Sequence, residues 1–116
     1  MVTYQWGIFW ADLDPTKGSE QSGTRPVLVI STEVVNQALP IVTAMSIISI
    51  KPGRKVYPTE VYFSSKETGL SKDSIAMSHQ IRAISKARLG SKCGSIDNDE
   101  LREKIRAVIK LYFELD

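Results

Sequence analysis

Short apolar segments separated by turn residues constrain the fold of this 116-residue chain more than any other feature. The segments are rich in β-branched and aromatic side chains, and turn formers such as the Pro-Gly pair at 52–53 lie between them, as is typical of short β-strands. Several such strands in succession favour a small β-barrel. The predicted strands cover residues 6–13, 27–31, 41–50 and 59–63, followed by short segments at 74–77 and 80–85, with residues 78–79 between or within them.

The end of the chain follows a different pattern, which predicts a helix. Asp97 is a suitable N-cap, and Glu100 follows three residues later, as in a capping box with acidic groups at the positive helix end. Apolar side chains then recur at helical spacing up to about Phe113, namely Leu101, Ile105, Val108, Ile109 and Tyr112. The sequence therefore predicts a mainly β (α+β) fold, a small β-barrel with a C-terminal α-helix.

Composition predicts a single domain over residues 1–116. Hydrophobic residues make up 42% of the chain and charged residues 24%, which is ordinary for a globular protein with one core. No run approaches the roughly 18 apolar residues of a spanning helix, and residues 1–5 lack the pattern of a secretory signal, so we expect no membrane association. The single cysteine, Cys93, excludes an internal disulfide and fits a cytoplasmic protein, and one cysteine with one histidine cannot form the usual zinc site.

The net charge of +2 is a weak basic bias, so local clusters matter more than the sum. One cluster lies in the turn at 51–55 and a second is spread over 82–92. Either cluster is compatible with a solvated surface or with a phosphate-binding face.

The loop at 18–26 carries the most specific chemistry. It places Glu20, Gln21 and Arg25 together with two glycines, directly before the apolar run at 27–30. An arginine in a turn beside a carboxylate suits an anionic substrate such as a phosphate. Pro26 also restricts the backbone of Arg25 to an extended conformation.

Several strings of residues together resemble the MazF/PemK (Kid) toxin family over essentially the whole chain. They are residues 10–15, 18–21, 23–30, Asn36, 39–40, 58–61 and 80–84. The resemblance implies an SH3-like barrel of the CcdB/MazF type that forms homodimers and cuts single-stranded RNA at short sequences without a metal, so no cofactor is expected. It also implies a cognate antitoxin whose extended tail covers the RNA groove.

Metal-free RNA cleavage normally uses the 2′-hydroxyl of the substrate as nucleophile. Such a reaction needs a base for the 2′-hydroxyl proton, a donor to the phosphorane oxygens and an acid for the leaving 5′-oxygen. Arg25 suits the phosphorane role as an electrostatic clamp, because a guanidinium stays protonated. Glu20 could act as the base if burial raises its pKa, or it could be a structural acceptor in the loop. Gln21 is either a loop-organising amide or an RNA contact.

The second catalytic residue of the family is a threonine late in the third strand, and this chain departs from that pattern. Counted without gaps from 39–40, the threonine position holds Ile48. Ser49 could replace the hydroxyl if a bulge or a one-residue slip turned it to the other face. An impaired site is the alternative. His79 could act as general base or contact RNA, or it could be structural.

The remaining predicted contacts are to RNA. Lys51, Arg54 and Lys55 would hold the RNA backbone, and Gln21, Thr24, Gln80 and Arg82 would line the same groove, with a salt bridge as the alternative role of Arg82. Unpaired bases could stack on Trp6, Phe9, Trp10 or Tyr57, although we expect Phe9 and at least one tryptophan to pack in the core or at an interface.

The resemblance, together with these residues, implies the toxin of a type II toxin–antitoxin system: a sequence-specific endoribonuclease acting on single-stranded RNA, mainly mRNA. Its products would carry a 2′,3′-cyclic phosphate and a 5′-hydroxyl. Two alternatives remain open. One is a non-enzymatic toxin resembling CcdB that binds DNA gyrase, and the other is a catalytically impaired member that only binds RNA or a partner protein.

Overall fold

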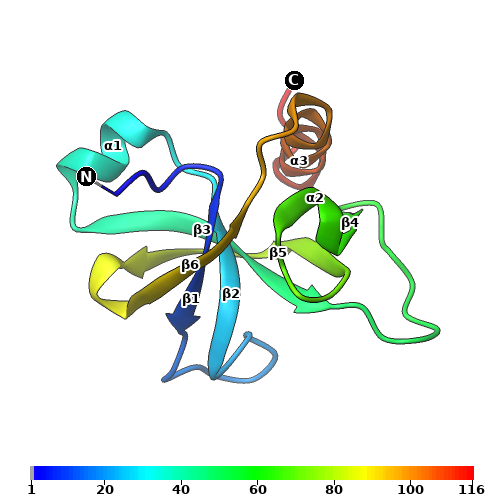
Figure 1. Cartoon of the computed structure of the whole chain (residues 1–116), viewed down its shortest axis with the longest axis horizontal. Helices are drawn as coiled ribbons and strands as arrows, with labels where there is room; N and C mark the ends of the chain where they lie inside the picture. The colour runs from blue at the N-terminus through cyan, green and yellow to red at the C-terminus, as the bar shows by residue number, and fades with distance from the viewer. Residues whose placement is uncertain (1) are drawn as a thin grey trace.

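The computed structural model describes residues 2–116, and its centre is a six-stranded antiparallel sheet (Figure 1). The strands lie in the order β4-β5-β3-β2-β1-β6. This arrangement, with a helix at the C-terminal end, confirms the predicted mainly β fold. The strands are β1 (Gly7–Asp12), β2 (Thr24–Val29), β3 (Ile41–Ser49), β4 (Glu60–Phe63), β5 (Ser74–Ser85) and β6 (Leu89–Ser95); the helices are α1 (Glu33–Ala38), α2 (Ser65–Thr68) and α3 (Asp99–Phe113), with a 3₁₀ turn at Lys86–Arg88.

The alternation of side chains along the strands creates two apolar clusters. Along β2, Leu28 contributes to one cluster, while Val27 and Val29 contribute to the other. The first cluster also receives Leu101 and Ile105 from α3, so the C-terminal helix covers that face of the curved sheet (Figure 1). Phe9 belongs to the second cluster and Trp6 to the first, which confirms the expected core packing of Phe9 and one tryptophan.

Strand β5 joins the two short segments predicted at 74–77 and 80–85. Its pairing with β3 is irregular at one place: Ala44 lies opposite Arg82, whereas Ser46 lies opposite Met77. The extra residues of β5 form a bulge around residues 78–81, which bends the strand and re-aims its side chains. Both His79 and Gln80 lie at this bulge, close to the β1–β2 and β3–β4 connections.

Helix α3 covers the predicted range, but its cap differs from the prediction. Asn98, not Asp97, is the N-cap, and its side-chain oxygen accepts a hydrogen bond from the Leu101 amide at 2.9 Å. Asn98 has the extended backbone of a capping residue and its oxygen reaches the third residue of the helix, as N-caps do. Tyr112, predicted to continue the apolar stripe, is 42% exposed.

Strand β2 begins three residues earlier than predicted, so Arg25 lies within the strand. Strand β6 and the short helices α1 and α2 were not predicted, because their sequences lack a clear apolar period. Within residues 2–116, no helix is both long and apolar enough to cross a membrane.

Helix α1 is tied to the start of the chain by the carboxylate of Glu33. This carboxylate accepts hydrogen bonds from the amides of Tyr4 (3.0 Å) and Gln5 (2.8 Å), and from the side chains of Asn36 and Gln37. Partial burial would raise the pKa of Glu33, but these hydrogen bonds outweigh it and lower the pKa to about 2. The cluster fixes the N-terminal segment on the side of the sheet that carries α1.

Candidate functional site

Two adjoining hollows lie where β2 begins and β3 ends. Arg25, Ile48 and Ser49 line both of them. The larger hollow has a volume of about 480 Å³ and also contains side chains from β1, β2 and the β4–β5 connection, among them Trp10, Thr24, Leu70 and Lys72. The smaller hollow, of about 220 Å³, adds Gln21, Lys51 and Arg54. The fold thus gathers most of the predicted site residues in one region.

Arg25 is the cation at the centre of this region. It lies opposite Ala11 in the β1–β2 ladder, and its Nε donates a hydrogen bond to the Ser22 carbonyl at 3.0 Å. This contact orients the guanidinium, while its two terminal nitrogens have no hydrogen-bond partner within residues 2–116. The side chain is exposed. The planar fork is therefore held at one edge and open to an anion at the other.

The β1–β2 loop, residues 13–23, is shaped by contacts from outside the loop. Gln80 accepts a hydrogen bond from the Gln21 amide and donates one to the Ser19 carbonyl, both at 3.2 Å. Gly18 and Gly23 have positive φ angles of 60° and 76°, which explains the two glycines of the motif. Gln80 is thus a loop anchor in this structure.

Glu20 and Gln21 occupy different surroundings in that loop. Glu20 is exposed, and its carboxylate accepts a hydrogen bond from the Lys17 amide at 2.6 Å, which corresponds to the structural-acceptor alternative. The burial on which a base role depended is not found. The side-chain oxygen of Gln21 is buried without a hydrogen-bond partner in the described part of the chain, and the residue lines the smaller hollow.

The third strand runs without a bulge from Ser46 to Ser49, since its pairing with β5 is regular there. Val27 lies opposite Ser46, so continuing the register puts Arg25 on the same face as Ile48. The slip that would have moved Ser49 onto that face does not occur. Ser49 nevertheless lines both hollows, because it is the last residue of its strand.

The β3–β4 loop, residues 50–59, carries the predicted basic residues. Lys51 lines the smaller hollow, and Lys55 is exposed. Arg54 lines the same hollow and forms a bidentate ion pair with Glu60, with distances of 3.0 Å and 2.9 Å. Of the three basic residues, Arg54 is the one held in a fixed place.

Glu60 is a buried carboxylate whose side chain has no exposed surface. Burial would raise the pKa of Glu60, but the hydrogen bonds from Arg54 and the Tyr57 amide outweigh it and hold the pKa below its usual value. The Nδ1 atom of His79 lies 3.9 Å from the same carboxylate. His79 lines neither hollow and its side chain is 42% exposed.

The second basic stretch supports the root of the β1–β2 loop. Arg82 donates a hydrogen bond to the Leu13 carbonyl at 3.3 Å, and Arg88 donates one to the Asp12 carbonyl at 3.1 Å. Arg82 lines neither hollow, and its recorded contact is this carbonyl, not a salt bridge. Thr24, in contrast, lies in the wall of the larger hollow.

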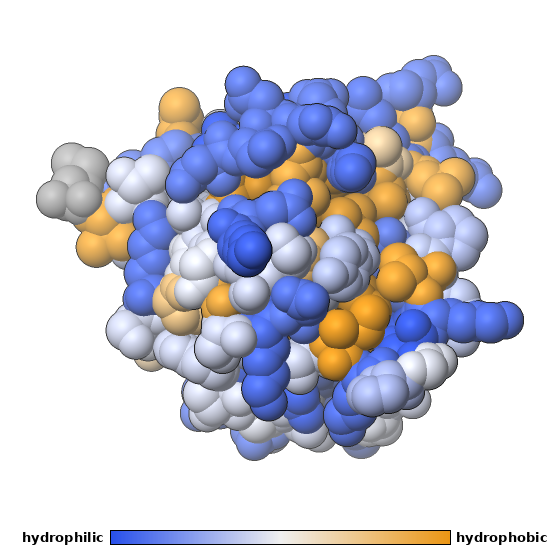
Figure 2. Space-filling view, turned by 45° about the vertical axis from the view of Figure 1, so that its right-hand side comes forward, coloured by the Kyte–Doolittle hydropathy of each residue, from blue (hydrophilic) through white to orange (hydrophobic). Residues whose placement is uncertain are grey.

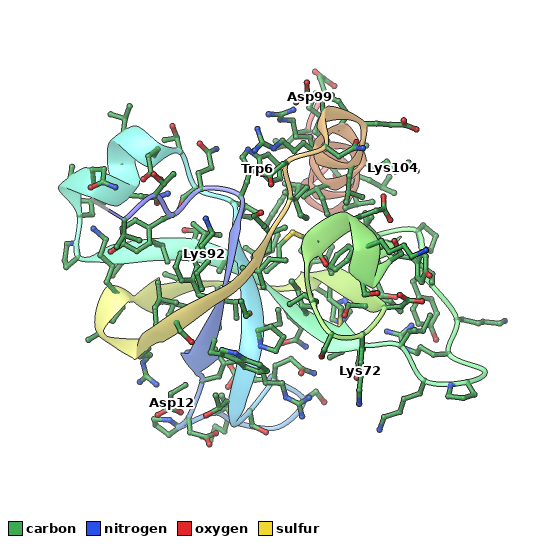
Figure 3. All side chains as sticks on the ribbon, in the orientation of Figure 1. Trp6, Asp12, Lys72, Lys92, Asp99 and Lys104 are labelled. Carbon is green, nitrogen blue, oxygen red and sulfur yellow. The ribbon has the colours of Figure 1, made fainter. Side chains whose placement is uncertain are left out.

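Two residues of this region, Lys72 and Glu60, were not identified as site residues from the sequence. Trp10, one of the four candidates for base stacking, is 43% exposed and lines the larger hollow. Lys72 follows the Gly-Leu-Ser turn after α2 and points toward the end of the molecule that carries the β1–β2 loop (Figure 3). Glu60 appeared only as part of a motif, because nothing in the sequence reveals that it is buried. Within residues 2–116, no group of three potential metal ligands comes together.

The fold and the site define a class: a small protein with a curved antiparallel sheet, a C-terminal helix and a basic double hollow centred on one arginine. Comparison with known proteins agrees. The family model described as PemK-like, MazF-like toxin of type II toxin–antitoxin system matches residues 4–113, so the chain belongs to this family.

Individual relatives cover nearly the whole chain. Endoribonuclease EndoA of Bacillus subtilis (strain 168) is 35% identical over 115 residues, which are 99% of this chain and 97% of that protein. The Mycobacterium tuberculosis toxin MazF-mt6 superposes with a TM-score of 0.76 at 27% identity, covering 95% of this chain and 98% of that one. The MazF structure from Deinococcus radiodurans has a TM-score of 0.81 at 21% identity, covers 99% of both chains and supports the fold alone.

Proposed function

We propose that this protein is the toxin of a type II toxin–antitoxin pair and a metal-independent endoribonuclease that cuts single-stranded RNA, mainly mRNA, at short sequences. The observation that carries the proposal is Arg25, held through Nε and open at its terminal nitrogens between two hollows. Family membership and the identity to a named endoribonuclease support it.

The proposed reaction is a transesterification within the RNA. The 2′-hydroxyl oxygen attacks the adjacent phosphorus, the bond from phosphorus to the 5′-oxygen breaks, and the products carry a 2′,3′-cyclic phosphate and a 5′-hydroxyl. Arg25 would donate two hydrogen bonds to the non-bridging oxygens, whose charge grows in the transition state. Such a clamp needs no proton transfer by the guanidinium itself.

Three residues from β3, β5 and the β1–β2 loop are the candidates for the remaining hydrogen bond and the proton transfers. The hydroxyl of Ser49 lines both hollows with Arg25 and is the proposed hydrogen-bonding partner of the reacting phosphate. His79 and Glu20 are the candidates for base and acid. His79 is the better supported of the two, since its side chain is 42% exposed, whereas the carboxylate of Glu20 already accepts a hydrogen bond from the Lys17 amide.

The RNA would lie across both hollows. Trp10 offers an exposed aromatic face on which an unpaired base can stack. Lys72 lies on the rim of the larger hollow, and Lys51 and Arg54 lie in the wall of the smaller one, so phosphates on either side of the scissile bond would meet cations. Thr24 and Gln21 are the proposed polar contacts to the strand.

A second copy of the chain and an antitoxin are the proposed protein partners. Large apolar side chains are exposed at the end of α3. Figure 2 shows further apolar patches, bordered by hydrophilic residues, on the face that this view turns toward the reader. Such patches mark interaction surfaces. A toxin with an RNA substrate would act in the cytoplasm, and we propose that location. The exposed residues at the end of α3 are Leu111, Tyr112, Phe113 and Leu115.

The experiment that tests this function uses a long single-stranded RNA in the presence of EDTA. Wild-type protein should produce fragments with 5′-hydroxyl ends, Arg25→Ala should produce none, and Ser49→Ala should be slower. Unchanged cutting by Arg25→Ala would reject the assignment of this residue. Absence of cutting by the wild type would favour the impaired or gyrase-binding alternatives, which a gyrase pull-down and an RNA-binding assay would then separate.

A further inference from the structure

One buried charged group has no part in the reaction as proposed above. Glu60, at the start of β4, is fully buried at its side chain and sits below a loop and a face that carry several cations. A buried carboxylate is costly unless it is paired and hydrogen-bonded. On a surface that has to attract phosphates, an anion also weakens binding through space. We therefore expect Glu60 to have a role that offsets both the cost of its burial and the weaker attraction of phosphates.

The contacts of Glu60 fix both ends of a short loop segment. One carboxylate oxygen accepts hydrogen bonds from the Tyr57 amide and from Arg54, each at 3.0 Å, and the other accepts from Arg54 at 2.9 Å. The guanidinium carbon of Arg54 also lies 5.3 Å from the centre of the Tyr57 ring. The segment 54–57 is thereby folded back on itself around one carboxylate.

This fold places Arg54 in the wall of the smaller hollow, which it shares with Arg25. Two guanidiniums thus line one hollow of about 220 Å³, one held by a backbone carbonyl and the other by a buried carboxylate. The side chain of Arg54 keeps 25% of its surface exposed despite the ion pair. Arg54 donates two hydrogen bonds to Glu60 and one to the Lys55 carbonyl, so two of its five donors remain for a second anion.

We propose that Glu60 is a positioning residue for RNA: it holds Arg54 so that this arginine binds the backbone phosphate next to the one clamped by Arg25. The proposal rests on the proposed function, since the ligand is the same RNA strand. The imidazole of His79 faces the same carboxylate at 3.9 Å, so Glu60 also links the bulge of β5 to the β3–β4 loop. Loss of the carboxylate frees Arg54 without removing its charge.

The test uses Glu60→Gln, for which the change in charge and the loss of the hold on Arg54 predict opposite effects on RNA binding. Glu60→Gln removes one negative charge, so a purely electrostatic view predicts tighter RNA binding and a steeper salt dependence. A positioning role predicts the reverse. We expect KM to rise about tenfold while kcat changes by less than about twofold, because contact with a flanking phosphate contributes to binding in the ground state and the transition state alike.

Binding is measured separately with an oligodeoxynucleotide that copies the mapped cleavage sequence and cannot be cut because it lacks 2′-hydroxyls. For Glu60→Gln its Kd should rise about tenfold, and the slope of log K against log salt should become shallower by about 0.7, the loss of one phosphate contact. Arg54→Gln and the double variant should show the same loss as Glu60→Gln, because the two residues act as one unit. Glu103→Gln is the matched control, since it neutralises an exposed glutamate paired with Arg106 on α3.

The outcomes separate this inference from the proposed function. Cutting of RNA by the wild type tests the function. With that established, tighter binding or an unchanged KM in Glu60→Gln would overturn the positioning role, as would additive losses in the double variant. If Glu60→Gln does not fold, Arg54→Lys decides, because it keeps the charge but loses the bidentate hold: a severalfold rise in KM is expected, and a wild-type KM would overturn the inference.

Discussion

The two loops beside Arg25 are held in different ways. The β1–β2 loop is anchored by the neutral amide of Gln80, with two hydrogen bonds of 3.2 Å to backbone groups. The β3–β4 loop is anchored by the buried carboxylate of Glu60, which accepts two hydrogen bonds from Arg54 and one from the Tyr57 amide. The first loop orients the clamp Arg25 through the Ser22 carbonyl, and the second loop carries the cations Lys51 and Arg54 of the smaller hollow.

The difference teaches how one site can separate chemistry from binding. The loop that we propose lies next to the reacting phosphate is tied to β5 by an uncharged amide, and the carboxylates of Asp14 and Glu20 accept hydrogen bonds from its backbone. The loop that we propose lies next to the flanking phosphate is shaped by an ion pair, which costs desolvation but holds a long side chain in one place. We therefore expect changes in the first loop to lower kcat and changes in the second to raise KM.

The largest effect should come from Arg25. Arg25→Ala should lower kcat by about 100-fold to 1,000-fold, because a preorganised donor to the phosphorane oxygens is lost. Arg25→Lys should recover only a small part, since an ammonium keeps the charge but not the planar fork. Single-turnover rates at saturating RNA measure both. Recovery of the full rate by lysine would show that charge alone is needed there.

The anchor of the first loop should matter next. Gln80→Ala removes both hydrogen bonds to the β1–β2 loop, and we expect kcat to fall about tenfold with a smaller change in KM, because the loop that orients Arg25 is loosened. Gln37→Ala on α1 is the matched control. A rise in KM at constant kcat would contradict the proposed division between the two loops.

A substitution at Ile48 should increase activity. Its side chain shares the face of Arg25, so Ile48→Thr would place a hydroxyl where the family has its threonine. We expect kcat to rise severalfold, as befits one added hydrogen bond. In the double variant with Ser49→Ala the rise should persist. An unchanged or lower rate for Ile48→Thr would mean that the reaction does not use a hydroxyl on that face.

The smallest effect concerns stability, far from both loops. The pKa of Glu33 is about 2 in the folded protein, below the ordinary value of 4.5, so its charged form is stabilised by folding. This contribution is complete above the ordinary pKa and is lost as the pH falls toward 2. In urea unfolding, the free energy of unfolding of the wild type should therefore fall by on the order of 1 kcal/mol more than that of Glu33→Gln between neutral pH and about pH 3. An equal pH dependence in both proteins would contradict the role of this cluster.

Much of the fold could be predicted from local patterns. The apolar periods located β1, β3, β4 and α3 to within one or two residues at most ends, because alternation and helical spacing report directly on burial. Strand β6 was missed because its residues, 89–95, include glycines and polar side chains and no clear period. The cap at Asn98 was missed because two neighbouring residues can both cap, and only the backbone geometry chooses between them.

Some residues of the candidate site could likewise be identified from the sequence, and others could not. Arg25 stood out because its motif is contiguous, and the ladder then placed Ile48 on its face. The roles of Gln80 and Glu60 could not be read from the sequence, since Gln80 reaches a loop 59 residues away and Glu60 is recognisable only from its burial. Long-range contacts of single side chains leave no periodic signal.

The central claim is that Arg25 supports attack by the 2′-hydroxyl of the RNA itself. The most direct measurement compares two synthetic RNAs in EDTA, identical except for one 2′-deoxynucleotide on the 5′ side of the mapped cleavage position. We expect the all-ribose strand to be cut to a 2′,3′-cyclic phosphate and a 5′-hydroxyl, and we expect no cutting at the substituted position. Cutting at that position, or fragments with 5′-phosphate ends, would contradict the central claim.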